Sequence, residues 1–481
     1  MKKCVLEIVD EVNIRFHNLD INTRRKLVEE VKFFLPYARH TPAFKLGRWD
    51  GCIRYCDIGG RSYINLLDKL LPIVQQQGYD FDIVDQRLQY DFKFNAIDQQ
   101  SYSHIVWPEG HRYAGKPIEV MDHQVEAINA YLENLQAVQS ISTGAGKTLI
   151  TGILSHKVEP YGRSIVIVPS KDLVTQTEEL YQMMGLDVGV FFGDRKEYGK
   201  THTICTWQSL EVLNKKSKTY DPDITLEDFI EGVVCIMVDE AHGAKAEILK
   251  KLMTTIFAGV PIRWGMTGTI PRAEEESYGV ISTIGPVVNK ISAVDLQEKG
   301  ILANLHIDIL QTTEFGEYKQ YAEEYKFLTT NDNRIKWLAE HIEEKVEAGN
   351  TLILVNRIET GKKLLEQLPE ATFISGTMKS KDRKTEYKSV QGANSKIIIA
   401  TYGVAAVGID IPRIFNLYLF EPGKSFIRVI QSIGRGIRKA EDKDFVQVYD
   451  ICANLKFSKR HLTERKKFYN EQGYPFKVKK V

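Results

Sequence analysis

The sequence predicts an α/β protein in which two doubly wound parallel-sheet lobes follow a small N-terminal α+β domain. Short apolar strands alternate with amphipathic helices from about residue 106 to 290, and the alternation resumes from about 303 to 452. Near-continuous apolar runs such as 233–238 are typical of parallel strands that helices cover on both faces. A chain of 481 residues is also too long for one hydrophobic core, which favours several domains.

Residues 1–105 are expected to form the α+β domain. Val12, Ile14 and Phe16 alternate with polar residues, which is the pattern of a half-buried strand. Asn22 or Thr23 is expected to cap a helix that Pro36 ends.

Two further elements are expected in this domain. Asp50-Gly51 predicts a tight turn between strands at 45–49 and 52–55. A second helix is expected from about 66 to 77, with Gly78 ending it.

The two lobes are expected at residues 106–295 and 296–452, with a hinge near 290–303. The predicted strands of the first lobe are 137–141, 164–168, 203–205, 233–238 and 264–266. Those of the second lobe are 351–355, 372–374, 396–400, 417–420 and 446–449. A helix is expected from about 333 to 348.

Charge is balanced over the chain, with 64 Lys and Arg against 63 Asp and Glu. No global field therefore attracts polyanions, and any nucleic-acid surface must be a local patch. One candidate is the basic tail 453–481, where nine Lys and Arg face only Glu464 and Glu471. The same composition also fits a solvated, partly helical tail.

Six cysteines do not make a zinc pattern, since only Cys52 and Cys56 are close and no histidine completes a site. Reduced thiols are typical of an intracellular protein. The chain has neither a signal-peptide pattern nor an apolar run of the roughly 20 residues that span a bilayer. We therefore expect a cytoplasmic protein without a membrane partner.

The run 142–148, Ser-Thr-Gly-Ala-Gly-Lys-Thr, follows a predicted strand and precedes a predicted helix. This context is typical of a phosphate-binding loop. Glycines let backbone N–H groups approach phosphate, and the helix N-terminus adds partial positive charge. Lys147 is expected to reach the β- and γ-phosphates of ATP, and Thr148 to ligate Mg²⁺. The predicted nucleotide-binding residues of the loop are Thr143, Gly144, Ala145, Gly146, Lys147 and Thr148.

Asp239 and Glu240 end the apolar run 233–238, so both carboxylates are expected at the C-terminal edge of a parallel sheet. Asp239 is predicted to hold Mg²⁺ and Glu240 to polarise the attacking water. The loop departs from the general pattern at Ile141, where glycine is usual.

A third string, Gln431-Ser-Ile-Gly-Arg-Gly-Ile-Arg438, lies in the second lobe. Arg435 and Arg438 are three residues apart on a predicted helix and therefore share a face. An arginine that reaches the γ-phosphate from a second domain stabilises transition-state charge. A site completed in this way needs both lobes.

Together these strings resemble the motifs of superfamily 2 helicases, and their order along the chain fits that superfamily. The resemblance covers residues 120–452 and implies two RecA-like lobes that hydrolyse ATP. The matching strings are Met121-Asp-His-Gln124, Ile167-Val-Pro-Ser170, Thr206-Trp-Gln-Ser-Leu210, the DEAH string Asp239-Glu-Ala-His242, Thr267-Gly-Thr269, Leu352-Ile-Leu-Val-Asn356, Ile399-Ala-Thr-Tyr-Gly403, Gly408-Ile-Asp410 and Gln431 to Arg438.

The resemblance also implies roles for single residues. It assigns nucleotide contacts to Gln124, Gly408, Asp410 and Gln431. It assigns coupling of hydrolysis to DNA contact to His242, Thr267 and Thr269. It assigns nucleic-acid contacts to Ser170, Thr206, Ser209, Asn356 and Thr401.

The N-terminal string from Phe44 to Arg54 resembles the N-terminal domain of the phage UvsW recombination helicases. That family places such a domain before two RecA-like lobes, and its loop also lacks the leading glycine. The resemblance implies a DNA helicase, of phage origin, that remodels branched DNA and R-loops in recombination, repair and replication. We expect it to act as a monomer on single-stranded, forked or branched DNA, and on RNA–DNA hybrids.

Arg48 and Arg54 are predicted to contact DNA, whereas Trp49 is expected to pack within its turn or to stack on a base. Three other readings stay open: an RNA helicase, a translocase on double-stranded DNA, and a strand-annealing protein in which ATP hydrolysis matters little.

Overall fold

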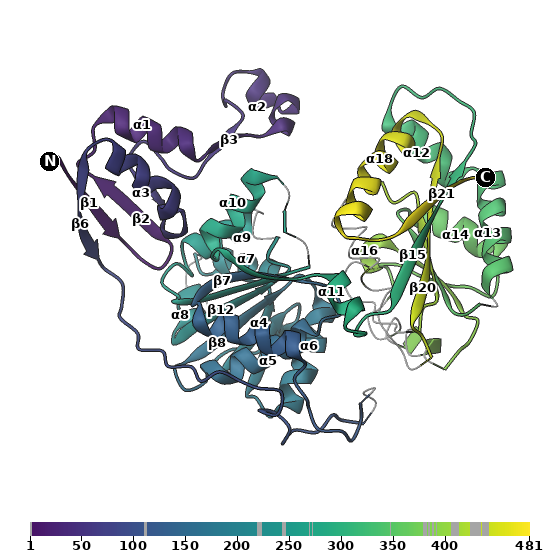
Figure 1. Ribbon diagram of the computed structural model, residues 1–481, viewed down its shortest axis with the longest axis horizontal. Coiled ribbons are helices and arrows are strands. Elements are labelled where there is room, and N and C mark those ends of the chain that lie inside the picture. The colour runs from purple at the N-terminus through teal and green to yellow at the C-terminus, as the bar shows by residue number, and fades with distance from the viewer. Residues whose placement is uncertain are drawn as a thin grey trace. The chain divides into compact units, whose positions relative to one another are not determined.

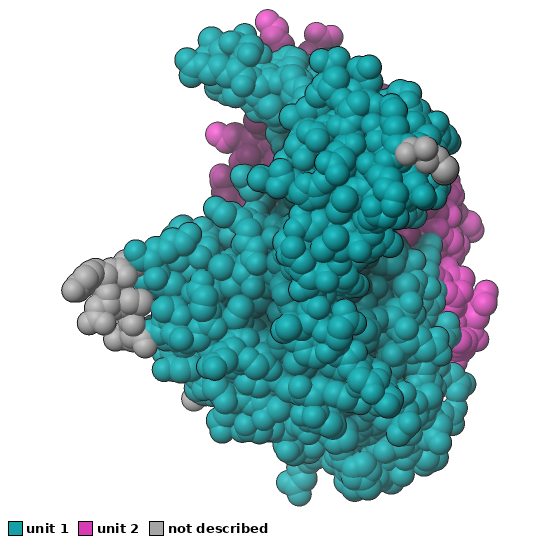
Figure 2. Space-filling view, turned by 90° about the vertical axis from the view of Figure 1, so that its left-hand side faces the viewer, with its two compact units in different colours: residues 1–141, 147–290 teal, residues 142–146, 291–481 magenta. Residues whose placement is uncertain are grey.

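A computed structural model gives the fold of the chain in two compact units, coloured separately in Figure 2. Unit 1 holds Met1–Ile141 and Lys147–Lys290, and unit 2 holds Ser142–Gly146 and Ile291–Val481. The division between Lys290 and Ile291 lies inside the predicted hinge. The structure describes residues 2–109, 113–218, 224–242, 247–268, 270–271, 273–346, 348–378, 382, 385–386, 389–390, 392–405, 413–423, 434 and 442–481.

The N-terminal domain is a four-stranded sheet in the order β5-β2-β1-β6, with helices α1 and α3 packed on it (Figure 1). Leu27 of α1 and Leu70 of α3 are fully buried with Phe16 of β2 in one core. The alternation around Phe16 thus predicted the strand correctly. The bounds are β1 (Lys2–Ile8), β2 (Asn13–His17), α1 (Ile21–Glu30), β5 (Arg61–Tyr63), α3 (Leu67–Gln76) and β6 (Tyr79–Asp85).

Two predictions in this domain are wrong. The helix cap is Asp20, whose carboxylate accepts a 2.8 Å hydrogen bond from the Thr23 amide, and the helix ends at Glu30 instead of near Pro36. The expected hairpin around Gly51 does not form. Strand β4 (Cys52–Arg54) pairs instead with β3 (Lys32–Phe34), while α2 (Pro42–Lys45) lies between them in sequence.

Tertiary contacts explain why the predicted helix ends early and the predicted hairpin does not form. Residues 32–34 have helical apolar spacing, but β4 offers them backbone partners, and pairing overrides a weak local propensity.

Lobe 1 is an eight-stranded sheet in the order β10-β9-β11-β8-β12-β13-β7-β14. All five predicted strands are present, within two residues at each end. They are β7 (Gln136–Ile141), β8 (Arg163–Val168), β11 (His202–Thr206), β12 (Val233–Asp239) and β13 (Ile262–Thr267). Strands β9 (Val188–Phe192), β10 (Arg195–Lys196) and β14 (Val287–Ile291) extend the sheet at its edges.

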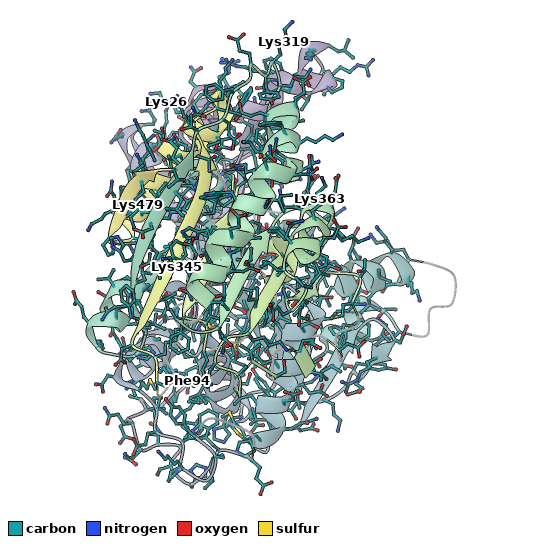
Figure 3. The ribbon with its side chains drawn as sticks, turned by 90° about the vertical axis from the view of Figure 1, so that its right-hand side faces the viewer. Lys26, Phe94, Lys319, Lys345, Lys363 and Lys479 are labelled. Carbon is teal, nitrogen blue, oxygen red and sulfur yellow. The ribbon has the colours of Figure 1, made fainter. Side chains whose placement is uncertain are left out.

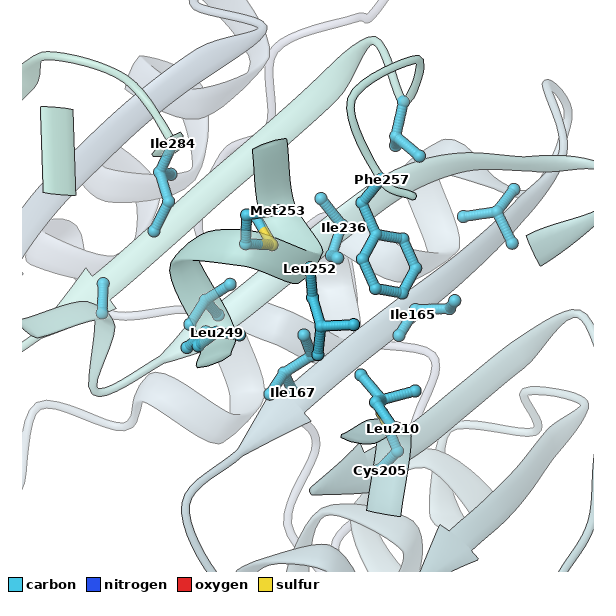
Figure 4. Packing of buried hydrophobic residues seen from close by; sticks show 14 of the residues in the cluster. Ile165, Ile167, Cys205, Leu210, Ile236, Leu249, Leu252, Met253, Phe257 and Ile284 are labelled. Carbon is cyan, nitrogen blue, oxygen red and sulfur yellow. The ribbon is translucent and has the colours of Figure 1, made fainter. Parts of the chain in front are cut away.

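Helices cover both faces of this sheet (Figure 1). One face carries α4 (Asp122–Glu133), α5 (Lys147–Val158) and α6 (Lys171–Met183). The other carries α7 (Trp207–Lys216), α8 (Leu226–Ile230), α9 (Glu247–Thr254) and α10 (Glu274–Thr283). Figure 4 shows Leu249 and Leu252 of α9 against Ile167 and Ile236 of the central strands. This core supports the sheet edge at which β12 ends.

Lobe 2 is a seven-stranded sheet in the order β17-β18-β16-β19-β20-β15-β21. Its predicted strands are also present, as β16 (Thr351–Val355), β17 (Thr372–Ile374), β18 (Ile397–Thr401), β19 (Asn416–Phe420) and β20 (Phe445–Ala453). The predicted helix 333–348 is α13 (Asp332–Val346). The remaining described elements are α11 (Ala293–Glu298), β15 (Asn304–Thr312), α12 (Tyr321–Thr330), α14 (Ile358–Gln367), α16 (Tyr402–Ala405), α18 (Lys456–Glu471) and β21 (Phe476–Lys480).

Residues 453–481, expected as a basic tail, belong to the fold of lobe 2. Helix α18 buries Arg465, which forms a bidentate ion pair with Asp450 at 2.8 and 2.9 Å. Strand β21 pairs with β15 at the sheet edge, and Lys479, labelled in Figure 3, lies on it. Lysines on an edge strand discourage pairing with another chain. No helix within the described ranges is long and apolar enough to cross a membrane.

Candidate functional site

The phosphate-loop candidate joins the end of β7 to the start of α5. Gly144 and Gly146 have φ angles of 91° and 84°, a region that residues with a Cβ rarely adopt. Helix α5 then starts at Lys147, so its free N–H groups and its positive dipole end lie beside the loop. The backbone therefore has the form that a phosphate group needs.

Lys147 meets the two carboxylates at the end of β12. Its Nζ lies 3.2 Å from Glu240 Oε1 and 3.8 Å from Asp239 Oδ1. All three side chains are at most 17% exposed. The Glu240 backbone is in the left-handed region, at φ 53°, and its amide donates to Asp239 Oδ1 at 2.9 Å. The structure thus brings together the three charged groups that the sequence predicted for ATP and Mg²⁺.

Burial and neighbouring charge move the pKa values of the two carboxyls in opposite directions. Burial is the largest influence on both. It raises the pKa of Asp239, whereas for Glu240 the charges of Lys147 and His242 outweigh it and lower the pKa. Glu240 is therefore held ionised, as an acceptor of a proton or a hydrogen bond.

This donor set fits a magnesium ion. Carboxylate and hydroxyl oxygens are what Mg²⁺ prefers, and Asp239 supplies one at the strand end, with Thr148 on the first turn of α5. The buried Oε2 of Glu240 accepts no well-aligned hydrogen bond from the described residues, although His242 Nδ1 lies 3.3 Å from it.

His242 joins the acidic pair to the next strand. Its Nδ1 lies 3.3 Å from Glu240 Oε2 and 3.0 Å from Thr267 Oγ1, at the end of β13. One imidazole thus bridges the predicted base and the predicted coupling residue.

Gln124 is the third residue of α4 and is 5% exposed. Its Oε1 accepts a 3.0 Å hydrogen bond from the Met121 amide, which satisfies one free donor at the helix start. The structure thus gives Gln124 a structural contact, and its predicted contact with adenine stays a prediction.

The predicted nucleic-acid residues of lobe 1 lie at the C-terminal ends of adjacent strands. Ser170 follows β8 and caps α6, accepting from the Leu173 amide at 3.3 Å. Thr206 ends β11 and caps α7, and its Oγ1 lies 3.0 Å from Ser209 Oγ. Thr206 and Ser209 are 5% and 8% exposed and their hydroxyls serve the cap, so the nucleic-acid contact predicted for them stays a prediction.

Lobe 2 has the same arrangement. Asn356 follows β16 and is exposed, and Thr401 ends β18. The two strands are adjacent, with Val355 paired to Thr401, so both predicted residues lie at one edge. The predicted residues Thr269, Gly408, Asp410, Gln431, Arg435 and Arg438 lie outside the described residues.

In the N-terminal domain, Arg54 forms an ion pair with Asp50, and the indole of Trp49 donates to the Cys52 carbonyl at 3.1 Å. Trp49 therefore has the packing role that was one of its two predicted roles. Arg48 is exposed. Of the two predicted arginines, Arg48 is thus the more available for phosphate.

The sequence analysis missed a buried charged cluster in lobe 2. Glu421, directly after β19, has φ 44° and lies 2.7 Å from Arg334, whose side chain is 1% exposed. A glutamate after an apolar strand, Asn416 to Phe420, was the available signal, since Glu240 has the same setting.

Comparison with known proteins supports the two lobes. Residues 117–272 match the res subunit of type III restriction enzymes, and residues 333–440 match the helicase conserved C-terminal domain. The ATP-dependent DNA helicase UvsW of Enterobacteria phage T4 is 22% identical over 95% of this chain and 94% of its own length.

Solved structures show the same fold. The Type ISP restriction-modification enzyme LlaBIII bound to DNA has a TM-score of 0.57 and 15% identity, covering 83% of this chain and 33% of its own. Dbp5 of S. cerevisiae, bound to RNA and ADP BeF3, has a TM-score of 0.53 and 17% identity, covering 76% and 90%. The chain is an ATP-dependent helicase with two RecA-like lobes, and it resembles the superfamily 2 helicases and, among them, the phage UvsW helicase.

Proposed function

We propose that this helicase unwinds and remodels branched DNA: it drives branch migration, regresses forks and removes RNA from R-loops in recombination, repair and replication. The observation that carries the proposal is the nearly full-length similarity to a phage DNA helicase, which includes the N-terminal domain as well as the lobes. The charged trio at the end of β12 supplies the hydrolysis that such work needs.

Hydrolysis starts from the contact between Lys147 and Glu240. When the phosphates of ATP bind at the loop, they compete for the Lys147 ammonium, and Glu240 is left free to orient the attacking water. Asp239 and Thr148 would hold Mg²⁺, which would neutralise charge on the phosphates. Arg435 and Arg438 are assigned to transition-state charge from the second lobe.

We assign the contacts with nucleic acid to residues at the C-terminal ends of the strands in each lobe. The helix starts at Ser170 and Thr206 present backbone N–H groups, and Asn356 and Thr401 present side chains at the corresponding edge of lobe 2. Such groups bind phosphate and carry no base information. Little sequence preference and strong salt dependence follow, with Arg48 adding a contact from the N-terminal domain.

The division into an N-terminal domain (1–105) and two lobes (106–295 and 296–452), with residues 453–481 completing the second lobe, belongs to this proposal. So do a monomeric state and a site of action in the host-cell cytoplasm. An RNA helicase is the second candidate, because one solved structure of this fold holds RNA.

The test measures ATP hydrolysis and strand separation with single-stranded, duplex, forked and four-way DNA, with an R-loop, and with single-stranded RNA. We expect forked and four-way DNA to stimulate hydrolysis most, and Glu240→Gln to abolish the stimulation. Stimulation by RNA alone would move the assignment to the RNA helicase. Hydrolysis on duplex DNA without strand separation would show a translocase.

A further inference from the structure

The N-terminal domain is attached to lobe 1 through a cluster of aromatic rings. The Phe33 ring of β3 lies 4.8 Å from that of Tyr278 on α10, and the Tyr55 ring lies 5.9 Å from it. The Tyr55 hydroxyl donates to the Glu275 carbonyl on the same helix at 2.6 Å. Residues 35–51, which include Arg48 and Trp49, connect β3 to β4. Helix α10 therefore contacts the chain at β3 and directly after β4, the two strands from which this segment extends.

Helix α9 makes the second contact. The Lys250 ammonium lies 4.1 Å from the centre of the Tyr55 ring and 5.7 Å from that of Tyr63. Burial lowers the pKa of Lys250 to about 8. The neighbouring residues Leu249 and Leu252 point instead into the core of lobe 1 (Figure 4). One short helix therefore packs on the lobe with one face and on the N-terminal domain with another.

Polar contacts complete the attachment. The Glu11 amide donates to the Ala258 carbonyl at 3.0 Å, and the Gln136 side chain donates to the Glu11 carbonyl at 2.7 Å. Asn65 donates to the Gln136 side chain at 2.8 Å. These contacts join the N-terminal domain to lobe 1 within one compact unit of the fold.

A buried arginine connects this interface to the ATP site. Arg263 of β13 is fully buried and donates to the carbonyls of Met253, in the last turn of α9, of Phe257, just after it, and of Thr283, at the end of α10. A cation at helix C-terminal ends offsets their negative dipoles. Thr267, which contacts His242, lies on the same strand four residues later.

We infer that Tyr278 and Lys250 form a joint that couples ATP hydrolysis in lobe 1 to nucleic acid held by the N-terminal domain. Arg263 positions the two helices of this joint, α9 and α10. The inference rests on the proposed function. In the part of the chain that the structure describes, Tyr278 and Lys250 contact rings of the N-terminal domain and not the predicted ATP ligands, so they are positioning residues.

The test compares Tyr278→Ala with Tyr278→Phe on forked DNA. The measured quantity is the number of base pairs separated per ATP hydrolysed, together with kcat and the DNA concentration that half-saturates hydrolysis. We expect Tyr278→Ala to keep kcat within about twofold and to lose about tenfold in base pairs per ATP, a typical coupling strength. Tyr278→Phe keeps the ring contacts and should behave as wild type.

Lys250→Ala and Lys251→Ala form a matched pair on the same helix, because Lys251 is exposed and Lys250 lies over the rings. Lys250→Ala should lower base pairs per ATP, and Lys251→Ala should not. Thermal melting of each variant verifies folding.

The experiment distinguishes failure of the joint from failure of the proposed function. If wild-type protein separates forked DNA and Tyr278→Ala does so with the same yield per ATP, the joint is refuted and the proposed function stands. If wild-type protein hydrolyses ATP but separates no branched substrate, the proposed function fails, and the inference fails with it.

Discussion

The two lobes place a glutamate at the same point of the same fold, but in different surroundings. Glu240 follows β12 and Glu421 follows β19, with φ angles of 53° and 44°. Such angles are uncommon for residues other than glycine. Each carboxylate has a cation beside it, Lys147 at 3.2 Å and Arg334 at 2.7 Å.

The two cations differ in how firmly they are held. Lys147 follows a glycine loop and is 12% exposed, so phosphate can draw it away. Arg334 is 1% exposed and also donates to Thr312 Oγ1 at 3.3 Å and to the Leu328 carbonyl at 2.8 Å. A glutamate at a strand end can therefore take part in a reaction only where its cation can leave, as at Glu240. Where the cation is fixed, as at Glu421, the glutamate is a structural anchor.

The largest expected contrast is in hydrolysis. Glu240→Gln should lower the kcat for ATP by at least about 100-fold, because the amide cannot accept a proton. Glu421→Gln should keep kcat within about threefold, since its described side-chain contacts are with Arg334 and Ser458. Phosphate release at saturating ATP and DNA measures both. Equal losses in the two variants would break the comparison.

The next contrast is in stability. Arg334→Met leaves Glu421 buried without its cation, which typically costs about 3–5 kcal/mol. Lys147→Met should cost less than this, because Lys147, Asp239 and Glu240 keep 12–17% of their side-chain exposure, whereas Arg334 and Glu421 keep 1% and 5%. Hydrogen exchange of α13 and α5 reports each lobe separately, without assuming two-state unfolding. A larger loss from Lys147→Met would contradict the assignment of Arg334 as an anchor.

The smallest contrast is in pH dependence. Burial raises the pKa of Glu421 and outweighs Arg334 and Arg465, whereas Lys147 and His242 outweigh burial and lower that of Glu240. Glu421 therefore adds stability below its ordinary pKa of 4.5, and this is lost as pH rises through the higher folded value. Glu240 adds stability above 4.5, and this is lost as pH falls through the lower folded value.

Hydrogen exchange at several pH values, compared with the corresponding Gln variants, measures these two trends. The slopes should have opposite signs, each at most about 1.4 kcal/mol per pH unit. Slopes of the same sign would show that the two surroundings are electrostatically alike.

Local patterns predicted the sheets well, because apolar runs such as 233–238 and 351–355 are buried on both faces and show no competing period. They failed where pairing decides the outcome. Strand β4 pairs with β3 and not with residues 45–49, and β21 forms from a lysine-rich end because β15 offers it an edge.

The chemical groups of the ATP site could be read from the residues alone: a glycine loop with Lys147, and two carboxylates after an apolar strand. Only the tertiary structure decided that Lys147 and Glu240, 93 residues apart in the chain, lie in contact. Parallel strands end at one edge, so groups distant in sequence meet there. The long-range contacts of Arg334 and Tyr278 carry no local signal, which is why the anchor and the joint emerged only from the fold.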